Sequence, residues 1–223
     1  MVCKLPKIVP IMNERQKMVD EIRKIYGLDS SRVLSAMLQV PRDKFIDPQY
    51  KELAYRDGPV PIGLGQTMSQ PYTVAFMTDL LTDNKKIKEW KVMEIGTGSG
   101  YQAAILSKLV EKVFTIEIVP ELAERAKKTL KKLGYKNIYV ELGSGEWGWK
   151  EHAPYNAIMI TAQVEKVPQE LFNQLKTGGV LVAPVGGRHL QTMTRYTKRR
   201  SGSLRRESFQ HYVFVPFVKK DKD

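Results

Sequence analysis

Three glycines at alternate positions, Gly96, Gly98 and Gly100, are the clearest sign of chemistry in this 223-residue chain. Glycine lets the backbone come within van der Waals distance of a ligand and adopts dihedral angles that are closed to other residues. A dinucleotide-binding turn, G-x-G-x-x-G, would need its last glycine one place later, where this chain has Tyr101. The spacing therefore points to a different ligand.

The full pattern is E-x-G-x-G-x-G from Glu94, which is typical of the S-adenosylmethionine (SAM) turn of class I methyltransferases. The glycines would bring backbone against the amino-acid part and the sugar of SAM. Glu94 would fix the loop or accept indirectly from the ammonium group of the ligand. Glu117 ends the next expected strand, about twenty residues after the first glycine, where a carboxylate can accept from both ribose hydroxyls. The alternative for Glu117 is a surface glutamate ahead of Pro120.

Ligands of doubly wound sheets bind at the carboxyl ends of the strands. Two more expected strands should therefore bring the residues that follow them to the same ligand. The third strand leads into Gly143-Ser144-Gly145, and glycines around a short polar residue suggest a backbone turn over a flat ligand such as adenine. Trp147 or Trp149 could pack nearby, although a tryptophan is more often simply part of the core. The fourth strand ends at Thr161, which would face the place where substrate and methyl group meet.

The segment 63–72 suits a carboxylate as the methyl acceptor. A carboxylate is ionised at neutral pH, so the transfer needs no general base and depends on orientation and electrostatic matching. The segment offers hydroxyls on Thr67 and Ser69, amides on Gln66 and Gln70, and a helix N-terminus that favours anions. An ordinary helix cap is the alternative interpretation of these residues.

From residue 90 onward, strand-like and helix-like segments alternate. This alternation predicts an α/β, Rossmann-like fold with a parallel sheet and helices on both faces. Residues 191–197 and 207–217 then alternate like two antiparallel strands joined by a basic turn at 198–206, which predicts a C-terminal hairpin. The expected parallel strands are 90–95, 112–116, 137–142, 155–161 and 179–184, and the expected helices between them are 101–110, 120–133 and 168–175.

The sequence of the N-terminal third indicates a helical element that packs on this sheet domain. Residues 41–68 are rich in proline and glycine and are expected to be irregular. We expect residues 1–82 to form a substrate-site element and residues 83–223 a SAM-binding domain, the two making one compact unit. Apolar spacing and helix-end signals predict N-terminal helices at 13–26 and 71–81 and, between them, a helix that is capped by Ser30 or Ser31 and ends before Pro41.

The chain resembles the protein-L-isoaspartate (D-aspartate) O-methyltransferase family in motifs that run through nearly its whole length. The specific part is the Gln-Thr-x-Ser-Gln-Pro segment at 66–71, because the glycine turn is shared by all class I methyltransferases. The other matching segments are 61–63, 94–102, 117–122, 143–149, 153–155, 175–187 and 214–216.

The resemblance implies a repair reaction. SAM would methylate the free carboxylate of an L-isoaspartyl or D-aspartyl residue in a damaged protein, leaving S-adenosyl-L-homocysteine, and the ester would close to a succinimide that partly hydrolyses to aspartate. By the same resemblance Ser69 would orient the substrate carboxylate. Thr67, Gln70 and Pro71 would shape the peptide groove, with the strand that contains Val213 on its other side.

Composition limits the kinds of partner, compartment and metal that we expect for this chain. The net charge of +12 favours anionic molecules, but the lysines are spread along solvated faces, so nucleic acid is not the expected partner. No run of about eighteen apolar residues predicts a membrane span, and the N-terminus lacks a signal-peptide pattern. The single Cys3 cannot form an intrachain disulfide, which favours an intracellular, reducing compartment. We expect a cytoplasmic protein, and we expect it to be a monomer. No metal is assigned, because no ligand spacing is found in His152, His189 and His211.

Two other functions stay open. A nucleic-acid methyltransferase would use the positive charge, but residues 161–164 lack the Asn/Asp-Pro-Pro-aromatic loop usual in base-amino methyltransferases. Enzymes that methylate a pyrimidine carbon use a cysteine nucleophile, and Cys3 is far along the sequence from any loop that could place it there. A non-catalytic relative with weakened SAM binding would account for Ser144 and Asn156, where the family usually has aspartates. The intact glycine turn, Glu117 and Ser69 argue against that relative.

Ser144 gives a testable consequence. A serine can accept from the adenine amino group, but this neutral hydrogen bond is weaker than that of an aspartate by ~1 kcal/mol. We therefore expect Ser144→Asp to tighten SAM binding about fivefold in a calorimetric titration. An unchanged affinity would contradict this role and would leave Glu141 or Glu146 as the acceptor.

Overall fold

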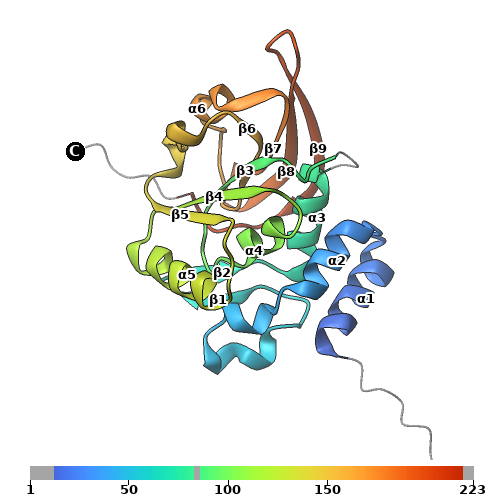
Figure 1. Ribbon diagram of the computed structural model, residues 1–223. Helices are drawn as coiled ribbons and strands as arrows, with labels where there is room; N and C mark the ends of the chain where they lie inside the picture. The colour runs from blue at the N-terminus through green and yellow to red at the C-terminus, as the bar shows by residue number, and fades with distance from the viewer. Residues whose placement is uncertain (1–12, 83–85, 218–223) are drawn as a thin grey trace, which may run out of the picture.

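The computed structural model describes residues 13–82 and 86–217, and its centre is a seven-stranded sheet in the order β5-β4-β3-β6-β7-β8-β9 (Figure 1). Strands β5, β4, β3, β6 and β7 run parallel, and β8 and β9 continue the sheet as antiparallel strands. This topology confirms the predicted fold class. The strands are β3 (Lys91–Ile95), β4 (Lys112–Glu117), β5 (Ile138–Leu142), β6 (Tyr155–Ile160), β7 (Leu175–Gly187), β8 (Leu190–Lys198) and β9 (Leu204–Tyr212).

Helices cover both faces of this sheet (Figure 1). One face packs against α3 and α4 through an apolar cluster that includes Val92, Val113 and Met159, and α5 lies beside α4. The other face packs against α6 through Met93, Ile158 and their neighbours. The helices are α1 (Glu14–Tyr26), α2 (Ser31–Gln39), α3 (Pro71–Thr82), α4 (Tyr101–Ser107), α5 (Pro120–Lys132) and α6 (Gln169–Asn173).

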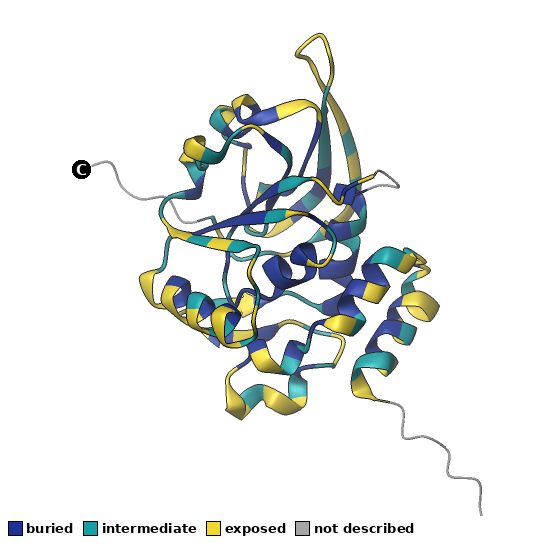
Figure 2. Cartoon of the chain, in the orientation of Figure 1, coloured by how far each residue is buried: buried dark blue, intermediate teal, exposed yellow. Residues whose placement is uncertain are grey.

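Helix α5 shows how the sequence dictates an element. Pro120 occupies the first turn, where its missing N–H costs nothing, and Glu121 and Lys132 complement the helix dipole at opposite ends. The side chains that face the protein are buried, whereas the outer face is exposed (Figure 2). The buried residues, Leu122, Ala123, Ala126 and Leu130, recur at helical spacing.

The N-terminal helices share a core with the sheet domain. Met18 of α1, Met37 of α2 and Ala75 of α3 belong to the same buried cluster as Tyr101 of α4 and Leu130 of α5. Within the described residues, the element at 13–82 therefore packs on the rest through continuous apolar contact. The boundary at 82/83 stays a prediction.

The expectation that residues 41–68 are irregular was wrong in part. This segment contains the 3-10 helices η1 (Arg42–Phe45) and η2 (Pro48–Leu53) and an antiparallel hairpin of β1 (Val60–Gly63) and β2 (Gln66–Met68). The hairpin turn has three successive residues with positive φ, namely Gly63 at 83°, Leu64 at 54° and Gly65 at 70°. Strands this short, around a turn with a leucine in the left-handed region, carry little periodic signal.

Several element ends also differ from the predictions, and the predicted strand 179–184 is longer at both ends, because β7 runs over Leu175–Gly187. Helix α4 ends at Ser107 rather than at residue 110, because Lys108 and Leu109 donate to carbonyls only three residues back. The predicted helix 168–175 stops at Asn173, and Leu175 already pairs with Tyr155 in the sheet.

The last predicted strand, 207–217, is β9, which is shifted toward the N-terminus and ends at Tyr212. The residues beyond it leave the hairpin: Phe214 N–H donates to Gln191 Oε1 at 2.7 Å, and Pro216 pairs with Gln163. The basic turn is correspondingly shorter, because β8 continues through Lys198 and β9 begins at Leu204.

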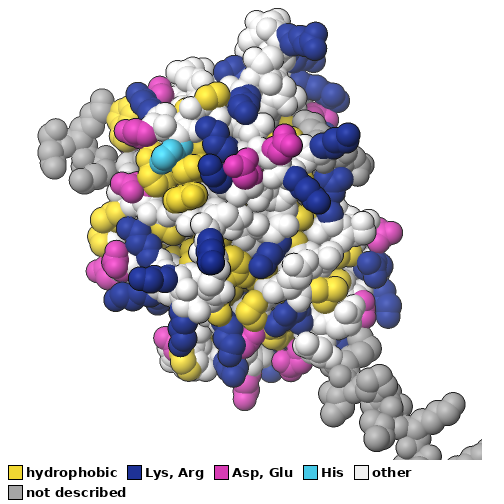
Figure 3. Space-filling view, in the orientation of Figure 1, with side chains coloured by type: hydrophobic (Ala, Val, Ile, Leu, Met, Phe, Trp, Pro, Cys, Tyr) yellow, Lys and Arg dark blue, Asp and Glu magenta, His cyan; other side chains and the backbone are white. Residues whose placement is uncertain are grey.

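Lysine and arginine side chains are spread over the whole visible face, with acidic side chains scattered among them (Figure 3). Among the described residues, no helix is long and apolar enough to cross a membrane. The same residues contain no cluster of three or more His, Cys, Asp or Glu side chains that could hold a metal ion. Cys3 lies outside the described residues.

Glu94 is a buried carboxyl group in the central strand β3. It is 0% exposed, its Oε2 accepts from Thr115 Oγ1 at 2.6 Å, and its Oε1 has no partner within the described chain. Burial raises the pKa of Glu94 to about 8; the hydrogen bond from Thr115 opposes this shift and the nearby Glu117 adds to it. The protonated form is therefore favoured in the folded protein at neutral pH.

This shift predicts a pH dependence of stability. Between the ordinary pKa of 4.5 and about 8, the folded protein keeps a proton that the unfolded chain releases, so the free energy of unfolding falls as the pH rises. Relative to Glu94→Gln, the wild type should lose on the order of 3 kcal/mol between about pH 5.5 and about pH 8.5 in urea titrations. If the free energies of unfolding of the two proteins changed with pH in the same way, the pKa of Glu94 would not be raised in the folded protein.

Candidate active site

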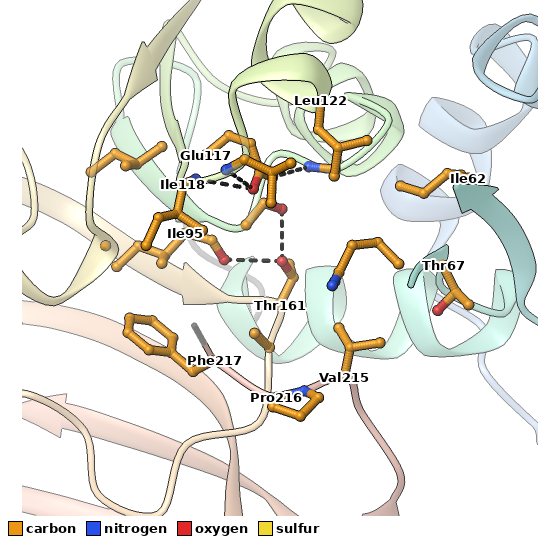
Figure 4. A pocket seen from close by; sticks show the side chains of 17 residues that line it. Ile62, Thr67, Ile95, Glu117, Ile118, Leu122, Thr161, Val215, Pro216 and Phe217 are labelled. Atoms are coloured by element: carbon orange, nitrogen blue, oxygen red, sulfur yellow. Dashed lines mark hydrogen bonds between the residues drawn. The ribbon is translucent and has the colours of Figure 1, made fainter. Parts of the chain in front are cut away.

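The glycine turn after β3 is held against the end of β6. Thr161 N–H donates to Ile95 O at 2.9 Å, and Thr161 Oγ1 lies within hydrogen-bond distance of Ile95 O, at 2.9 Å, and of Gly96 O, at 2.8 Å (Figure 4). A Cβ atom on Gly96, which has a φ of 97°, would lie 2.4 Å from Thr161 Oγ1. The turn therefore needs glycine at 96, and the Thr161 hydroxyl hydrogen is used within the protein.

Glu117, at the end of β4, points its carboxylate toward this turn. Oε2 accepts from Gly98 N–H at 2.8 Å, and Oε1 accepts from the N–H groups of Ile118 and Val119, each at 3.0 Å (Figure 4). The side chain lines a cavity although the residue is only 6% exposed. Because a carboxylate has about four acceptor positions, three backbone bonds leave one, on Oε2.

Glu94 and Gly100 act behind the turn rather than at a cavity wall. Thr115 bridges Glu94 to Thr97, since its hydroxyl lies 2.7 Å from Thr97 Oγ1. Gly100 has a φ of 87°, and a Cβ there would lie 3.3 Å from the side chain of Leu130. Of the two roles expected for Glu94, the geometry supports the one that fixes the loop.

The turn after β5 approaches β3 closely. A Cβ on Gly145 would lie only 2.1 Å from Ile95 Cγ2, so a larger residue cannot fit without a shift. Ser144 Oγ is buried and has no hydrogen-bond partner in the described part of the chain. Trp147 is 50% exposed, and Trp149 packs edge-on against Phe114, so neither reaches a cavity wall near the turn.

A first cavity opens where these segments meet (Figure 4). Its walls come from the glycine turn, the end of β4 and start of α5, the β1–β2 hairpin, and the segment 215–217. The lining residues are Ile62, Gln66, Thr67, Ile95, Gly96, Gly98, Ile116, Glu117, Ile118, Val119, Leu122, Gly145, Thr161, Ala162, Val215, Pro216 and Phe217.

A second cavity adjoins the first and is more polar in its side chains. It brings together Ser69 and Gln70 ahead of α3, Thr73 in its first turn, and the extended segment after β9. The lining residues are Pro59, Thr67, Ser69, Gln70, Thr73, Thr161, Tyr212, Val213, Phe214 and Val215. Thr67, Thr161 and Val215 belong to both cavities.

The backbone of Ser69 is anchored by a buried arginine. Arg42 is 0% exposed; its Nη2 donates to Ser69 O at 2.6 Å and its Nε to Ala54 O at 2.8 Å. Its guanidinium lies 4.8 Å from the ring centroid of Tyr101, the first residue of α4. Burial lowers the pKa of Arg42 and raises the pKa of Tyr101 to about 12.

The structure thus brings most of the predicted residues to two adjoining cavities. Gly96, Gly98, Glu117, Gly145, Thr161 and Thr67 line the first, and Thr67, Ser69, Gln70, Thr161 and Val213 line the second. Four others line neither cavity: Glu94, Gly100, Ser144 and Pro71.

Asn156, one of the two departures from the family pattern, lies at the opposite edge of the sheet. Its Oδ1 accepts from Lys91 N–H at 2.9 Å, at the start of β3, and lies 3.4 Å from Lys176 Nζ. It therefore joins strand beginnings and has no direct contact with the cavities.

Sequence reasoning missed the apolar walls. Ile118, Val119 and Leu122 follow Glu117 directly, and Phe217 comes from the far end of the chain. The first three carry a usable signal, because apolar residues after a strand-ending carboxylate would lie beside its ligand. Phe217 has no local signal, since only the path of the segment after β9 brings it to the cavity.

Comparison with known proteins identifies the family. Residues 13–222 match the family model for protein-L-isoaspartate(D-aspartate) O-methyltransferase. The protein-L-isoaspartate O-methyltransferase of Dictyoglomus thermophilum is 48% identical over 204 residues, covering 92% of this chain and 90% of that protein. That of Gloeobacter violaceus is 46% identical over 204 residues, covering 91% of this chain and 98% of that protein.

Solved structures agree with this match. A protein-L-isoaspartate O-methyltransferase superposes with a TM-score of 0.81 at 28% identity; the match covers 91% of this chain but 65% of that longer chain. A Plasmodium falciparum structure in complex with S-adenosyl-L-homocysteine gives a TM-score of 0.82 at 24% identity, covering 93% of this chain and 100% of that one, and supports the fold. With its fold, glycine turn and sequence all in agreement, the chain belongs to the protein-L-isoaspartate(D-aspartate) O-methyltransferase family.

Proposed function

We propose that this protein transfers the methyl group of SAM to the free carboxylate of L-isoaspartyl and D-aspartyl residues in damaged proteins. The observation that carries the proposal is the junction of the two cavities at Thr67, Thr161 and Val215. One cavity has the glycines and the carboxylate expected around SAM, and the other has hydroxyls and a helix N-terminus that suit an anion. A methyl group held in the first cavity would face an acceptor held in the second.

The residues of the first cavity fit SAM, which supplies an electrophilic methyl group on a sulfonium when bound. Gly96 and Gly98 expose backbone at the wall, and the remaining acceptor position on Glu117 Oε2 suits one ribose hydroxyl. Bonding to both ribose hydroxyls would require one of the backbone bonds to Oε1 to lengthen. Gly145 and Ile116 would lie along the flat adenine.

The second cavity fits a carboxylate. Pro71 begins α3, a twelve-residue helix whose first-turn N–H groups favour an anion at Ser69 and Thr73. The hydroxyls of Ser69 and Thr67 would donate to the acceptor oxygens. Val213, which is 75% exposed, would contact the peptide on the opposite side. Since the acceptor is already ionised, these groups act by orientation and require no base.

We further propose that the protein acts as a cytoplasmic monomer on isoaspartyl-containing proteins and peptides. The single cysteine supports a reducing compartment. A nucleic-acid methyltransferase and a non-catalytic relative are the competing outcomes of the assay that follows.

The assay is methyl transfer from labelled SAM to a synthetic peptide that contains isoaspartate, with the aspartate isomer as control. Label should appear in the isoaspartyl peptide alone. Ser69→Ala should lower kcat/KM by about 10- to 100-fold, because one orienting hydrogen bond to a charged group is lost, while SAM affinity stays the same. The matched control, Ser35→Ala on the exposed side of α2, should behave like the wild type.

Two outcomes would overturn the function. Label in RNA but in neither peptide would favour the nucleic-acid enzyme, and the absence of both label and SAM binding in folded protein would indicate the non-catalytic relative. An unaffected Ser69→Ala variant would remove Ser69 from the site without changing the reaction.

The turn after β5 provides a test of the SAM cavity. In Gly145→Ala, the new methyl group would collide with Ile95, so we expect SAM binding to weaken at least about tenfold and stability to fall by about 1–3 kcal/mol. Gly143→Ala is the matched control, because the nearest atom to its Cβ is Ile116 Cγ2 at 3.8 Å. Calorimetric titration and thermal denaturation measure both effects, and equal SAM affinities would argue against this wall.

A further inference from the structure

Gln70 uses both of its amide hydrogens inside the protein. It lies directly before α3 and lines the second cavity with Ser69 and Thr73. Its Nε2 donates to Asp57 Oδ1 at 2.8 Å and to the Tyr26 hydroxyl at 3.1 Å. A carboxamide has two N–H donors, so none is left for a ligand.

The orientation of the carboxamide follows from the same contacts. The Tyr26 hydroxyl donates to the second oxygen of Asp57, so its own oxygen must accept from Gln70. A flipped carboxamide would set Oε1 against the Asp57 carboxylate, placing two acceptors face to face. Tyr26 is itself fixed by stacking on Tyr72, with 3.9 Å between ring centroids. Asp57 and Tyr26 therefore determine which end of Gln70 is available.

The available end is an acceptor. Oε1 receives one hydrogen bond, from Thr73 Oγ1 at 3.3 Å, and keeps a second acceptor position. The sequence suggested that the amide of Gln70 helps to bind an anion, but with both hydrogens engaged it cannot donate to a carboxylate. A group that meets Gln70 in the cavity must instead bring an N–H or O–H.

We propose that Gln70 Oε1 accepts the backbone N–H of the isoaspartyl residue, and that Asp57 and Tyr26 are positioning residues that hold Gln70 in this polarity. The inference rests on the proposed function. The nitrogen of an isoaspartyl residue is attached to the same carbon as its free carboxylate. A carboxylate oriented by Ser69 therefore brings this N–H beside the next residue, Gln70. Ser69 and Gln70 together select a carboxylate that has a neighbouring amide N–H over a carboxylate that has none.

The test uses three isoaspartyl peptides and the full chain. One peptide is unmodified, one is N-methylated at the isoaspartyl nitrogen, and one is N-methylated two residues away. With wild-type protein, we expect only the first modification to raise KM, by about tenfold, with kcat within about twofold, because a single hydrogen bond is removed.

The variants then show whether Asp57 sets the polarity. In Asp57→Asn, and more weakly in Tyr26→Phe, the KM for the unmodified peptide should rise about five- to tenfold and the penalty of N-methylation should fall to about twofold. The matched control is Asp29→Asn, because Asp29 is exposed and its carboxylate pairs with Arg23 rather than with Gln70. It should reproduce the wild-type pattern.

The outcomes separate this inference from the function on which it rests. If wild-type protein methylates no isoaspartyl peptide, the proposed function fails. If it methylates the peptide but the N-methyl penalty is absent, or is equally large in Asp57→Asn, the function stands and the role of Gln70 and Asp57 is overturned.

Discussion

The buried guanidinium of Arg42 is the constraint on which the arrangement of the two cavities depends. Taking this cation out of water costs several kcal/mol, which its contacts with the Ser69 and Ala54 carbonyls and the face of Tyr101 offset in part; Nη1 has no hydrogen-bond partner in the described part of the chain. Ser69 lines the second cavity, whereas Tyr101 begins the helix that follows the glycine turn. One side chain therefore links the segment that would orient the substrate to the helix that follows the turn expected to hold the cofactor.

The β1–β2 hairpin completes this junction from the N-terminal side. Thr67 of β2 lines both cavities, and Arg125 of α5 donates to the carbonyl of Ile62 in β1. The hairpin is thus tied to the helix that follows Glu117, although the two are far apart in sequence. A parallel sheet supplies the cofactor edge by topology alone, but the acceptor wall has to be added by this N-terminal element.

The sequence predicts what local periodicity and turn chemistry encode. Alternating elements predict the parallel sheet, and the glycine spacing with Glu117 predicts the wall of the first cavity, both of which the structure contains. It fails where long-range contacts decide. The β1–β2 hairpin is too short to show a period, and the segment after β9 leaves the sheet because Gln191 and Gln163 capture its backbone. Neighbours in sequence also diverge: Gly145 lines the cavity, whereas Ser144 does not.

The remaining hydrogen-bonding capacity of the site agrees with the chemistry of an ionised acceptor. Thr161, Glu117 and Gln70 direct most of their donors and acceptors to the protein, which fixes their positions before any ligand binds. A carboxylate needs no proton removed, so rigid placement is worth more here than a titrating side chain. The groups that are left over form a short set of opposite polarities: hydroxyl donors at Thr67 and Ser69, and single acceptor positions on Glu117 and Gln70. An anion beside an amide N–H matches the groups of the second cavity, because the anion would accept from the hydroxyls of Thr67 and Ser69 and the N–H would donate to Gln70.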